Sequence, residues 1–375
     1  MNLNLLVKLL VLIVLFSCEQ NNEPEVVVLK PTRKDKLVLG KAEEIIRLET
    51  TNESYLDFVT KAHIDKKNNR IMVNSDMNLF LFDADGKFIT KLKKGMGPGE
   101  VNMVVSFAVD SEHKRIFVLD MGSLIHVYGF DLNFIESHKL SEFYSLDLHY
   151  ADDDNLFLYC SYVGRNEKHF VGIYDLNEKR VINRFVSADE SPYPLLCMGN
   201  ASNFFEYRDR LYFRSANIFG LFEFHADTFQ RLVTYDLEAM AVPESFFASY
   251  VEKRNRSTFG DEALEKGYVP YLNESFIFKD HFFAVLFDKN SSCYSIDNKN
   301  LKKVYRQEQL SDYFNLPKLK SLNRVCGIQD DFLTFSCLPL EFFKGEEELK
   351  SKVVELNGER IEVNYDDNPF LIVVR

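Results

Sequence analysis

Short apolar and aromatic runs alternate with polar turns along most of the chain, and residues 70–100 show this pattern most clearly. Three β-rich runs occupy positions 70–73, 78–82 and 88–92. The segment DADGK joins the last two, and an Asp-Gly pair between apolar runs is a strong hairpin signal, because glycine adopts the positive φ that such a turn needs. The pattern predicts an antiparallel sheet of three or four strands, followed by a glycine-containing loop.

The same arrangement recurs along the chain. The sequence DKKNNRIMVNSDMNLFLFDADGKFI aligns with DSEHKRIFVLDMGSLIHVYGFDLNFI, which begins at Asp110. Further copies span 151–185, 206–237 and 278–307, and a sixth begins at Gln329. Where no large insertion intervenes the copies are spaced by about 42 to 57 residues, roughly the range of β-propeller blades. We therefore predict an all-β fold, a six-bladed β-propeller.

A closed propeller must pair its first and last strands, because an open sheet edge leaves backbone groups free to pair with other chains. The runs at 44–48 and 370–374 are short and β-rich, and neither has another partner in the repeat pattern. We expect these two runs to pair and to close the ring.

Two insertions show a helical pattern. Residues 243–254 begin with proline, and the apolar side chains of Phe246, Phe247 and Tyr250 follow helical spacing. Residues 261–266 could add a further turn. The second predicted helix spans 341–355, although the following Asn-Gly pair would instead suit a hairpin.

Composition narrows the possible functions. The 375 residues are 46% hydrophobic and 27% charged, which is ordinary for a globular protein with a large core. The chain contains 34 Phe and 18 Tyr residues, and both residue types favour strands. The formal net charge of −12 makes nucleic acid a poor partner, since a phosphate backbone repels an acidic protein.

The N-terminus has the features of an export signal. Residues 3–16 form an apolar run that is too short to span a bilayer but has the length of a signal-peptide core. The run ends in Leu-Phe-Ser-Cys, which resembles a bacterial lipobox whose cysteine, here Cys18, is lipidated. An ordinary secretory signal with an incidental cysteine is the alternative. Glu19 follows the cysteine, and by resemblance to known sorting signals this favours the outer membrane.

We therefore divide the chain into three parts. Residues 1–18 are predicted to be a lipoprotein signal peptide, residues 19–36 a flexible tether rich in polar residues, and residues 37–375 the propeller. Contact with the membrane is expected through the lipid anchor only.

The cysteines beyond Cys18 give no sign of metal binding. No CxxC or Cys/His spacing suggests zinc, and two of the cysteines sit in apolar strand contexts. We expect them to be small buried residues, and a disulfide between Cys326 and Cys337 to be absent because a hairpin would offset them. The five cysteines are Cys160, Cys197, Cys293, Cys326 and Cys337.

Two short motifs carry a resemblance to a known family. The loop GMGPGE follows the first repeat and the motif DDNP precedes the last strand. With these motifs the chain resembles the six-bladed β-propeller lipoproteins of Bacteroidetes, which are related in form to NHL and TolB-type propellers. The resemblance implies a propeller on the cell envelope and no established activity. The signature positions are Gly95, Gly97, Pro98, Gly99, Glu100, Asp366, Asp367, Asn368 and Pro369.

Several residue groups could carry chemistry, and each has a structural alternative. The GMGPGE loop could bind an anion through its backbone N–H groups, or it could simply connect two blades. The run 152–155 (DDDN) could hold calcium or form a solvated turn. The eight histidines could converge on the propeller axis as metal ligands, or lie separately in the core and on the surface. Acidic residues such as Asp65 and Asp110 could act as acid and base on a glycan, or cap turns. We favour the structural alternative for each group, and expect no cofactor and no metal.

The function we expect is a non-catalytic binding or scaffolding module on the cell envelope. Loops from several blades form a concave surface that can contact an envelope protein, a peptide or a glycan. The alternative is an extracellular enzyme acting on carbohydrate or peptide, with acid and base residues at the channel. A convergent set of titratable side chains in the channel would favour the enzyme, whereas a channel of Phe, Tyr and backbone would exclude it. A sensory or assembly role through the tether is a third hypothesis.

Overall fold

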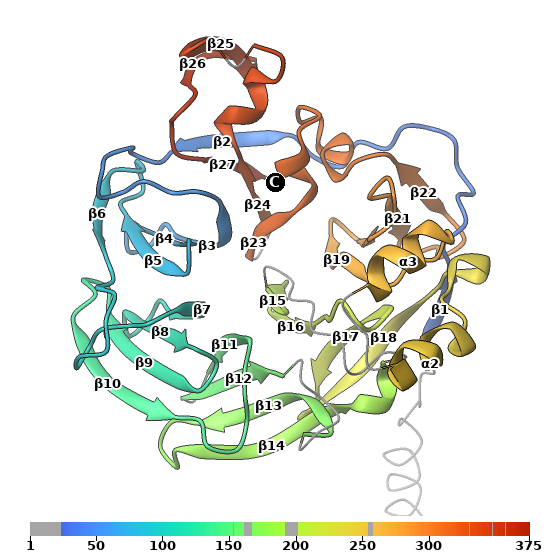
Figure 1. Ribbon diagram of the computed structural model, residues 1–375, viewed down its shortest axis with the longest axis horizontal. Coiled ribbons are helices and arrows are strands. Elements are labelled where there is room, and N and C mark those ends of the chain that lie inside the picture. Colours follow the sequence, from blue (N-terminus) through green and yellow to red (C-terminus); the bar gives the residue numbers. More distant parts are fainter. Residues whose placement is uncertain are drawn as a thin grey trace, which may run out of the picture.

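Six four-stranded antiparallel units surround a common centre in the computed structural model, so the chain is a six-bladed β-propeller as predicted (Figure 1). The structure describes residues 24–152, 154–160, 167–191, 202–253, 258–329, 331–346, 348–356 and 358–375. Within each blade the strands are antiparallel neighbours, and the innermost strand lies nearest the axis.

The first three blades follow the chain without interruption. Blade 1 contains β3 (Val59–Asp65), β4 (Arg70–Ser75), β5 (Asn78–Phe82) and β6 (Phe88–Lys91). Blade 2 contains β7 (Val104–Asp110), β8 (Arg115–Asp120), β9 (Leu124–Gly129) and β10 (Phe134–Lys139). Blade 3 contains β11 (Asp147–Ala151), β12 (Asn155–Tyr159), β13 (His169–Asp175) and β14 (Arg180–Ser187), and η1 (Ala188–Glu190) follows it.

The other three blades carry the insertions. Blade 4 contains β15 (Phe204–Tyr207), β16 (Arg210–Phe213), β17 (Gly220–His225) and β18 (Thr228–Asp236), followed by η2 (Glu238–Met240). Blade 5 contains β19 (Leu272–Phe278), β20 (His281–Leu286), β21 (Cys293–Asp297) and β22 (Val304–Gln307), followed by η3 (Leu310–Phe314) and η4 (Lys320–Asn323). Blade 6 contains β23 (Val325–Gln329), β24 (Phe332–Cys337), β27 (Phe370–Val374) and β2 (Ala42–Arg47).

The ring is closed by its two ends, as predicted. Strand β2 near the N-terminus pairs antiparallel with the C-terminal strand β27, with Ile45 opposite Ile372 and Arg47 opposite Phe370. Strand β27 also pairs with β24, so blade 6 combines both ends of the chain in one sheet. This pairing ties the first part of the fold to the last within a single blade.

Aromatic side chains fill the spaces between blades. Between blades 3 and 4 the ring of Phe157 packs against Phe204 at 6.0 Å and Phe229 at 5.7 Å, and Phe204 lies 5.4 Å from Phe213. Each of these side chains is at most 8% exposed. Edge-to-face and tilted pairs of this kind stabilise a core beyond the area they bury, which explains the high phenylalanine content.

The segment predicted to be a flexible tether lies partly against the propeller. Strand β1 (Glu25–Val28) pairs in parallel with β18, the outer strand of blade 4. Thr32 then contacts blade 5, where its hydroxyl accepts a hydrogen bond from the Val304 N–H at 2.9 Å. Val27 and Leu29 are buried at 2% and 3% exposure, so this short alternating run covers an otherwise free sheet edge. Residues 19–23, the predicted signal peptide and Cys18 lie outside the described residues.

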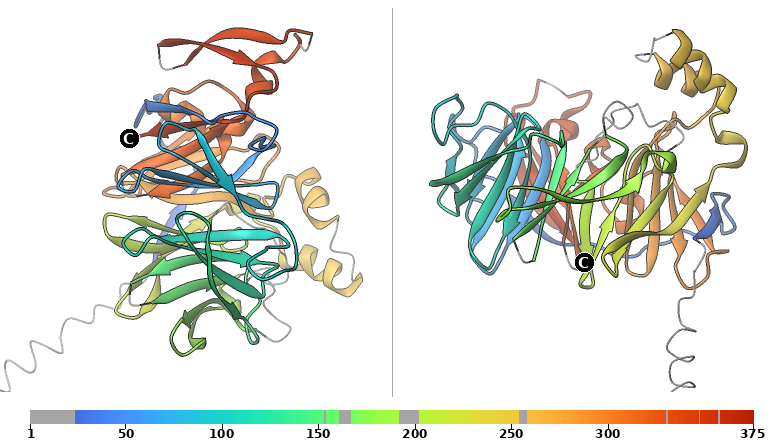
Figure 2. Two further views of the ribbon diagram at one scale, coloured as in Figure 1. Left: turned by 90° about the vertical axis from the view of Figure 1, so that its left-hand side faces the viewer. Right: turned by 90° about the horizontal axis from the view of Figure 1, so that it is seen from below.

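The structure confirms the prediction for the first insertion and corrects it for the second. The first forms α2 (Glu244–Lys253) and α3 (Phe259–Glu265), which project from one face of the ring between blades 4 and 5, as predicted (Figure 2). The prediction of a helix at 341–355 is wrong. This insertion instead contains η5 (Pro339–Phe343) and a hairpin of β25 (Ser351–Leu356) and β26 (Glu359–Asn364).

The hairpin has a simple physical basis. Val354 and Leu356 on β25, and Ile361 and Val363 on β26, are buried at 8% exposure or less, which is the period of two that a strand requires. Gly358 has a φ of 80° at the turn, where glycine is favoured. Glu and Lys residues in this stretch favour a helix locally, but burial of the alternate apolar positions decides the structure.

The described cysteines behave as expected. Cys160, Cys293, Cys326 and Cys337 are all buried and none forms a disulfide. Burial raises the pKa of the thiols of Cys293, Cys326 and Cys337, so these groups stay protonated and unreactive. Cys197 lies outside the described residues. Within the described part of the chain, no helix combines the length and apolarity needed to cross a membrane.

Candidate functional site

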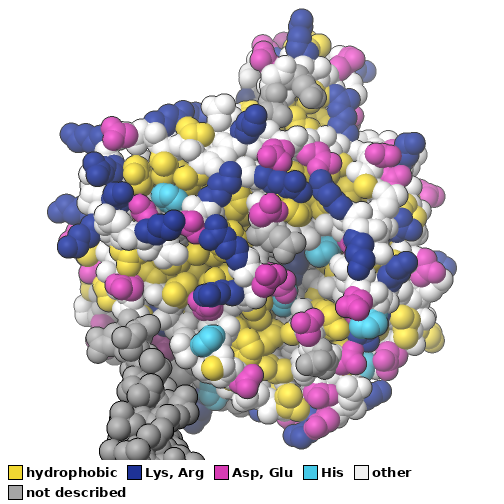
Figure 3. Space-filling model, turned by 180° about the vertical axis from the view of Figure 1, so that it is seen from behind, with side chains coloured by type: hydrophobic (Ala, Val, Ile, Leu, Met, Phe, Trp, Pro, Cys, Tyr) yellow, Lys and Arg dark blue, Asp and Glu magenta, His cyan; other side chains and the backbone are white. Residues whose placement is uncertain are grey.

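A cavity of about 1800 Å³ occupies the centre of the propeller. The innermost strands of five blades form its wall, namely β3, β7, β11, β15 and β23. The strand β19 of blade 5 contributes no described side chain to this wall, because β15 and β23 contact each other in front of it. The face in Figure 3 is hollowed near its centre, and acidic, basic and histidine side chains lie around the hollow.

The mouth of the cavity is formed by the turns that follow the innermost strands. In blade 1 this turn supplies Lys66 and Lys67, and in blade 2 it supplies Glu112 and His113. Exposed carboxylates from turns of blades 3, 4 and 6 complete the mouth, and one of them, Asp227, lies in the turn between β17 and β18. These carboxylates are Asp152, Asp209, Asp227 and Asp331.

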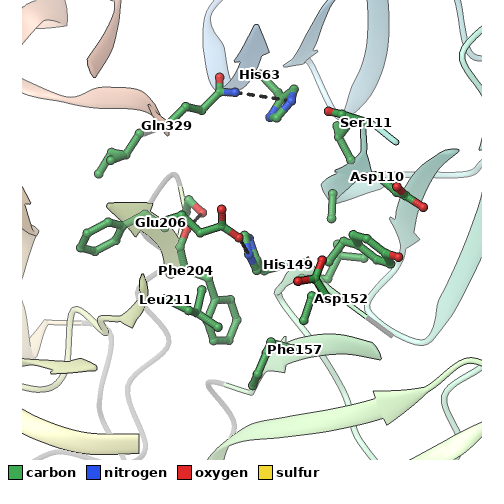
Figure 4. Close-up of a pocket in the computed structure, with 18 of the residues that line it drawn as sticks. His63, Asp110, Ser111, His149, Asp152, Phe157, Phe204, Glu206, Leu211 and Gln329 are labelled. Carbon is green, nitrogen blue, oxygen red and sulfur yellow. Dashed lines mark hydrogen bonds and ion pairs between the residues drawn. The ribbon is translucent and has the colours of Figure 1, made fainter. Parts of the chain in front are cut away.

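Four polar side chains from four different blades line the middle of the cavity as two hydrogen-bonded pairs (Figure 4). His149 Nε2 lies 2.9 Å from Glu206 Oε1, which joins blades 3 and 4. His63 Nε2 lies 3.4 Å from the amide nitrogen of Gln329, which joins blades 1 and 6. Gln329 is itself held in place, because its side-chain oxygen accepts a hydrogen bond from the Ile64 N–H at 2.8 Å.

The protonation states of this group follow from its surroundings. The hydrogen bond from His149 is the main cause that lowers the pKa of Glu206, so this carboxylate stays ionised. Burial lowers the pKa of His63 to about 4, although Asp65 opposes the shift, so His63 is neutral at physiological pH. The middle of the cavity therefore presents one fixed negative charge beside a neutral imidazole.

Apolar side chains form the rest of the wall. Phe224 on β17 is half-buried and packs against Phe157 at 5.0 Å and Phe229 at 5.0 Å. Phe185 on β14 lies 6.1 Å from Phe224 and is also half-buried. A bound molecule would thus meet an apolar surface on the side of blades 3 and 4, next to the polar group in the middle.

A buried polar network lies at the end of the cavity opposite the mouth, and we call it the floor network: Lys61, Ser106, Asp147, Asn203, Arg214 and Glu274. Asp147 is at its centre. Its Oδ1 accepts hydrogen bonds from Lys61 Nζ at 2.9 Å and Ser106 Oγ at 2.5 Å, and its Oδ2 accepts one from the Asn203 N–H at 2.5 Å. One carboxylate thus joins the innermost strands of blades 1 to 3 and the start of blade 4.

The floor network continues into blade 5. Asn203 Nδ2 donates to the carbonyl of Arg214 at 3.0 Å, and Arg214 Nη1 lies 2.6 Å from Glu274 Oε2. The Arg214 and Glu274 side chains are 1% and 0% exposed. Burial raises the pKa of Glu274 despite the arginine beside it. This pair holds β19 against blade 4 although β19 does not line the cavity.

The predicted signature loop at Gly95–Glu100 lies outside the cavity and connects blade 1 to blade 2. The Glu100 carboxylate accepts a hydrogen bond from the Gly97 N–H at 3.0 Å, so the loop satisfies this donor itself. A side chain at position 95 would collide with the same carboxylate, because a Cβ there would lie 2.0 Å from Oε2. Gly99 has a φ of 74°, which favours glycine. These contacts support the connecting role over the anion site.

The DDNP motif also lies away from the cavity. Asn368 is fully buried, and its side chain accepts a hydrogen bond from the Leu56 N–H and donates to the carbonyls of Glu49 and Ser54, each at 2.8 Å. Asp367 accepts from the Asn364 N–H at 2.8 Å. Asp366 is exposed, and Pro369 is buried. The motif therefore fixes the entry to β27 against the segment before β3, next to the strands that close the ring.

The other predicted candidates separate into turn residues and cavity residues. Asp65 and Asp110 lie at the mouth but cap turns: Asp65 accepts from the Asn68 N–H, and Asp110 from the His113 N–H. His63 and His149 line the cavity, whereas His126 and His138 are buried inside blade 2. No three His, Cys, Asp or Glu side chains among the described residues come close enough to hold a metal ion. Asp153 of the DDDN run lies outside the described residues.

Sequence reasoning missed the residues that define the cavity best. Glu206, Gln329 and the floor network were not singled out, because each lies far along the chain from its partner. One signal was present: Asp147 and Glu274 are charged residues at the start of apolar strand runs, where a buried charge needs a partner.

We predict that His63 makes the protein less stable in mild acid. Its pKa in the folded state, about 4, is below the ordinary value of 6.5, so the native state binds fewer protons and stability falls as the pH drops from about 6.5 towards 4. His63→Gln should remove this pH dependence. Between about pH 7.5 and about pH 5, the free energy of unfolding of the variant should therefore fall by about 1–2 kcal/mol less than that of the wild type. Urea unfolding of both proteins at the two pH values measures the effect. If the free energies of unfolding of the two proteins differed by the same amount at both pH values, the prediction would be contradicted.

Comparisons with known proteins place the chain in a family and find a solved structure of the same architecture. A Bacteroides fragilis protein described as a candidate exported protein shares the architecture with a TM-score of 0.71 and 16% sequence identity, over 93% of this chain and 99% of that chain. A structure of U3-55K matches with a TM-score of 0.47 and 10% identity, over 89% of this chain and 99% of that one. A comparison with curated proteins gives no match. Residues 34–375 match the family described as "Domain of unknown function (DUF4934)", so the chain belongs to that family.

Proposed function

We propose that this protein is an exported, non-catalytic binding module whose ligand enters the central cavity. The observation that carries this proposal is the cavity itself, which combines an apolar wall with polar groups from several blades. Pockets that bind ligands share this composition, and a volume of about 1800 Å³ exceeds the usual range for a drug-sized ligand, which is about 300–1000 Å³. An extended ligand such as a segment of a protein, a peptide or an oligosaccharide fits this size.

A blocking variant tests the proposal. Ser111 lines the cavity and is half-buried, so Ser111→Trp places a large side chain at its mouth. Ser137→Trp is the matched control, because Ser137 is exposed on β10 at the outside of blade 2. Residues 24–375 are screened by thermal shift against short peptides, oligosaccharides and solubilised envelope proteins, since a ligand that binds only the native state raises the melting temperature.

The expected result is a ligand that stabilises the wild type and Ser137→Trp but not Ser111→Trp. A ligand that stabilises all three proteins equally would bind elsewhere and would overturn the cavity as the site. The proposal would also be overturned if a panel covering these three ligand classes gave no shift for the wild type.

An enzyme acting on carbohydrate or peptide is the second candidate, and one observation favours it. His63, His149 and Glu206 all line the cavity, and the pKa values of His63 and Glu206 are lowered; titratable groups with perturbed pKa values in a cleft are frequent at active sites. Turnover of an identified ligand that is lost in His149→Ala, with binding retained, would favour the enzyme over the binding module.

We also propose that the protein is an outer-membrane lipoprotein anchored through Cys18. The apolar run before the cysteine and its lipobox-like end support this localisation. We predict that Cys18→Ala in the full chain leaves the precursor unprocessed or releases the protein from the membrane, as measured by fractionation and intact mass. Unchanged fractionation and mass would show that Cys18 does not anchor the protein.

A further inference from the structure

We propose that the cavity selects a cationic group carried on an apolar stem, the chemistry of a Lys or Arg side chain in a bound peptide. This inference rests on the proposed function, since it requires the cavity to be a binding site, and it adds the chemical class of the ligand.

The charges that line the cavity are unbalanced. Nine of the lining residues are Asp or Glu and five are Lys or Arg, which leaves an excess of four negative charges when histidine is neutral. A cleft with one dominant sign of charge and walls of low dielectric concentrates the field and attracts ligands of the opposite sign.

Four of the five positive charges are already paired, which makes the imbalance larger. Lys61 pairs with Asp147 at 2.9 Å, Lys66 with Glu44 at 2.5 Å and Arg210 with Glu223 at 2.8 Å. Arg375 lies 3.8 Å from Glu43. Only Lys67 lines the cavity as a cation with no ion-pair partner among the described residues.

Five carboxylates at the mouth, in contrast to most of the cations, have no ion-pair partner among the described residues. Each is exposed, and within the described part of the chain none forms an ion pair with Lys, Arg or His. They come from five turns in four different blades, so they encircle the opening. These carboxylates are Glu112, Asp152, Asp209, Asp227 and Asp331.

The interior of the cavity also presents groups that attract a cation. Beyond the mouth, Glu206 presents an ionised carboxylate whose side chain is 49% exposed, held by His149. The half-buried rings of Phe185 and Phe224 lie on the neighbouring wall, and an aromatic face attracts a cation as well as an alkyl chain. A Lys or Arg side chain would thus place its stem on the rings and its charge on the carboxylate.

The test compares labelled peptides that differ only in charge. The probes are fluorescein-labelled Ala-Lys-Phe-Lys-Ala and its Gln and Glu analogues, with spermidine as a free polyamine competitor and a neutral oligosaccharide as a further competitor. We expect the Lys peptide to bind residues 24–375 at least about tenfold more tightly than the Gln peptide, and its affinity to fall as salt rises from about 50 to about 500 mM.

Two matched triple variants distinguish binding at the cavity mouth from a general attraction by the net charge of the protein. Asp209→Asn, Asp227→Asn and Asp331→Asn together should weaken the Lys peptide by about tenfold. Asparagine is suitable because Asp209 and Asp227 have φ values of 57° and 60°, a conformation that asparagine tolerates. The control, Asp35→Asn, Asp76→Asn and Glu308→Gln, changes the same net charge at exposed positions away from the cavity and should weaken binding less than about twofold.

The outcomes are distinct. Equal weakening by both triple variants would overturn the inference, since the attraction would then depend on net charge. Spermidine binding as tightly as the Lys peptide would overturn the peptide as the source of the cation. Preferential binding of the oligosaccharide or the Glu peptide, blocked by Ser111→Trp, would overturn the cationic ligand but leave the cavity as the binding site. If no probe binds, the cationic class is overturned, and the broader ligand screen alone decides the proposed function.

Discussion

We expect Arg214→Ala to lower the free energy of unfolding by about 4 kcal/mol, because it leaves the buried Glu274 carboxyl without its partner. The two side chains are 1% and 0% exposed, and their charged atoms lie 2.6 Å apart. Arg214 also donates to the carbonyl of Ser202 at 2.8 Å and to that of Ser275 at 3.0 Å. The substitution therefore removes a charge and leaves buried acceptors unpaired, which is the costliest way to break such a contact.

The loss should depend on pH in a defined direction. Burial already raises the pKa of Glu274 above its ordinary value of 4.5, and removing the arginine raises it further. A carboxyl whose folded pKa exceeds its unfolded pKa favours the folded state in acid and loses this contribution as the pH rises above about 4.5. The deficit of Arg214→Ala relative to the wild type should therefore be larger at about pH 8 than at about pH 5, as measured by urea unfolding.

Two further variants sharpen this test. Arg180→Ala removes an arginine whose side chain is 62% exposed and pairs with Glu178, so it should cost less than about 1 kcal/mol. Arg214→Met combined with Glu274→Leu removes both charges and should be more stable than either single variant. Equal costs for Arg180→Ala and Arg214→Ala would mean that burial of the pair does not determine its contribution.

The fold could be predicted because its signals are local and repeated. Each blade carries its own apolar runs and turns, so the repeats indicate six blades although no single repeat is specific. The pairing of β2 with β27 followed from the same reasoning, since a closed ring requires a partner for each. The insertion at 341–355 shows the limit: charged residues favour a helix, but burial of Val354 and Leu356 makes it a hairpin.

The site could not be predicted in the same way, because its side chains meet only through the closed ring. His149 and Glu206 are 57 residues apart, and Lys61 and Asp147 are 86 residues apart. Neither spacing corresponds to a motif, and the distance between two blades depends on how the sheets pack. The motifs that were recognisable, GMGPGE and DDNP, stabilise a connection and the closing strand. In this protein the recognisable motifs stabilise the fold, whereas the cavity is formed by residues that belong to no recognisable motif.

Asp147→Ala is expected to lower the free energy of unfolding by about 3–4 kcal/mol and to disturb the cavity at the same time. The Asp147 side chain is 3% exposed, and it binds Lys61, Ser106 and the Asn203 backbone. Its removal leaves the Lys61 ammonium, which is 15% exposed, without a negative partner. Because these contacts join blades 1 to 4, their loss should also loosen the strands that carry His63, His149 and Glu206.

The controls separate the network from the general effect of removing a carboxylate. Asp152→Ala removes an exposed aspartate at the mouth and should change stability by less than about 0.5 kcal/mol. Lys61→Met combined with Asp147→Ala removes the uncompensated charge and should recover part of the lost stability, measured by urea unfolding. If this double variant is no more stable than Asp147→Ala alone, the stranded ammonium is not the cause of the loss. The cost would then lie in the hydrogen bonds to Ser106 and Asn203, and Ser106→Ala alone should reproduce a large part of it.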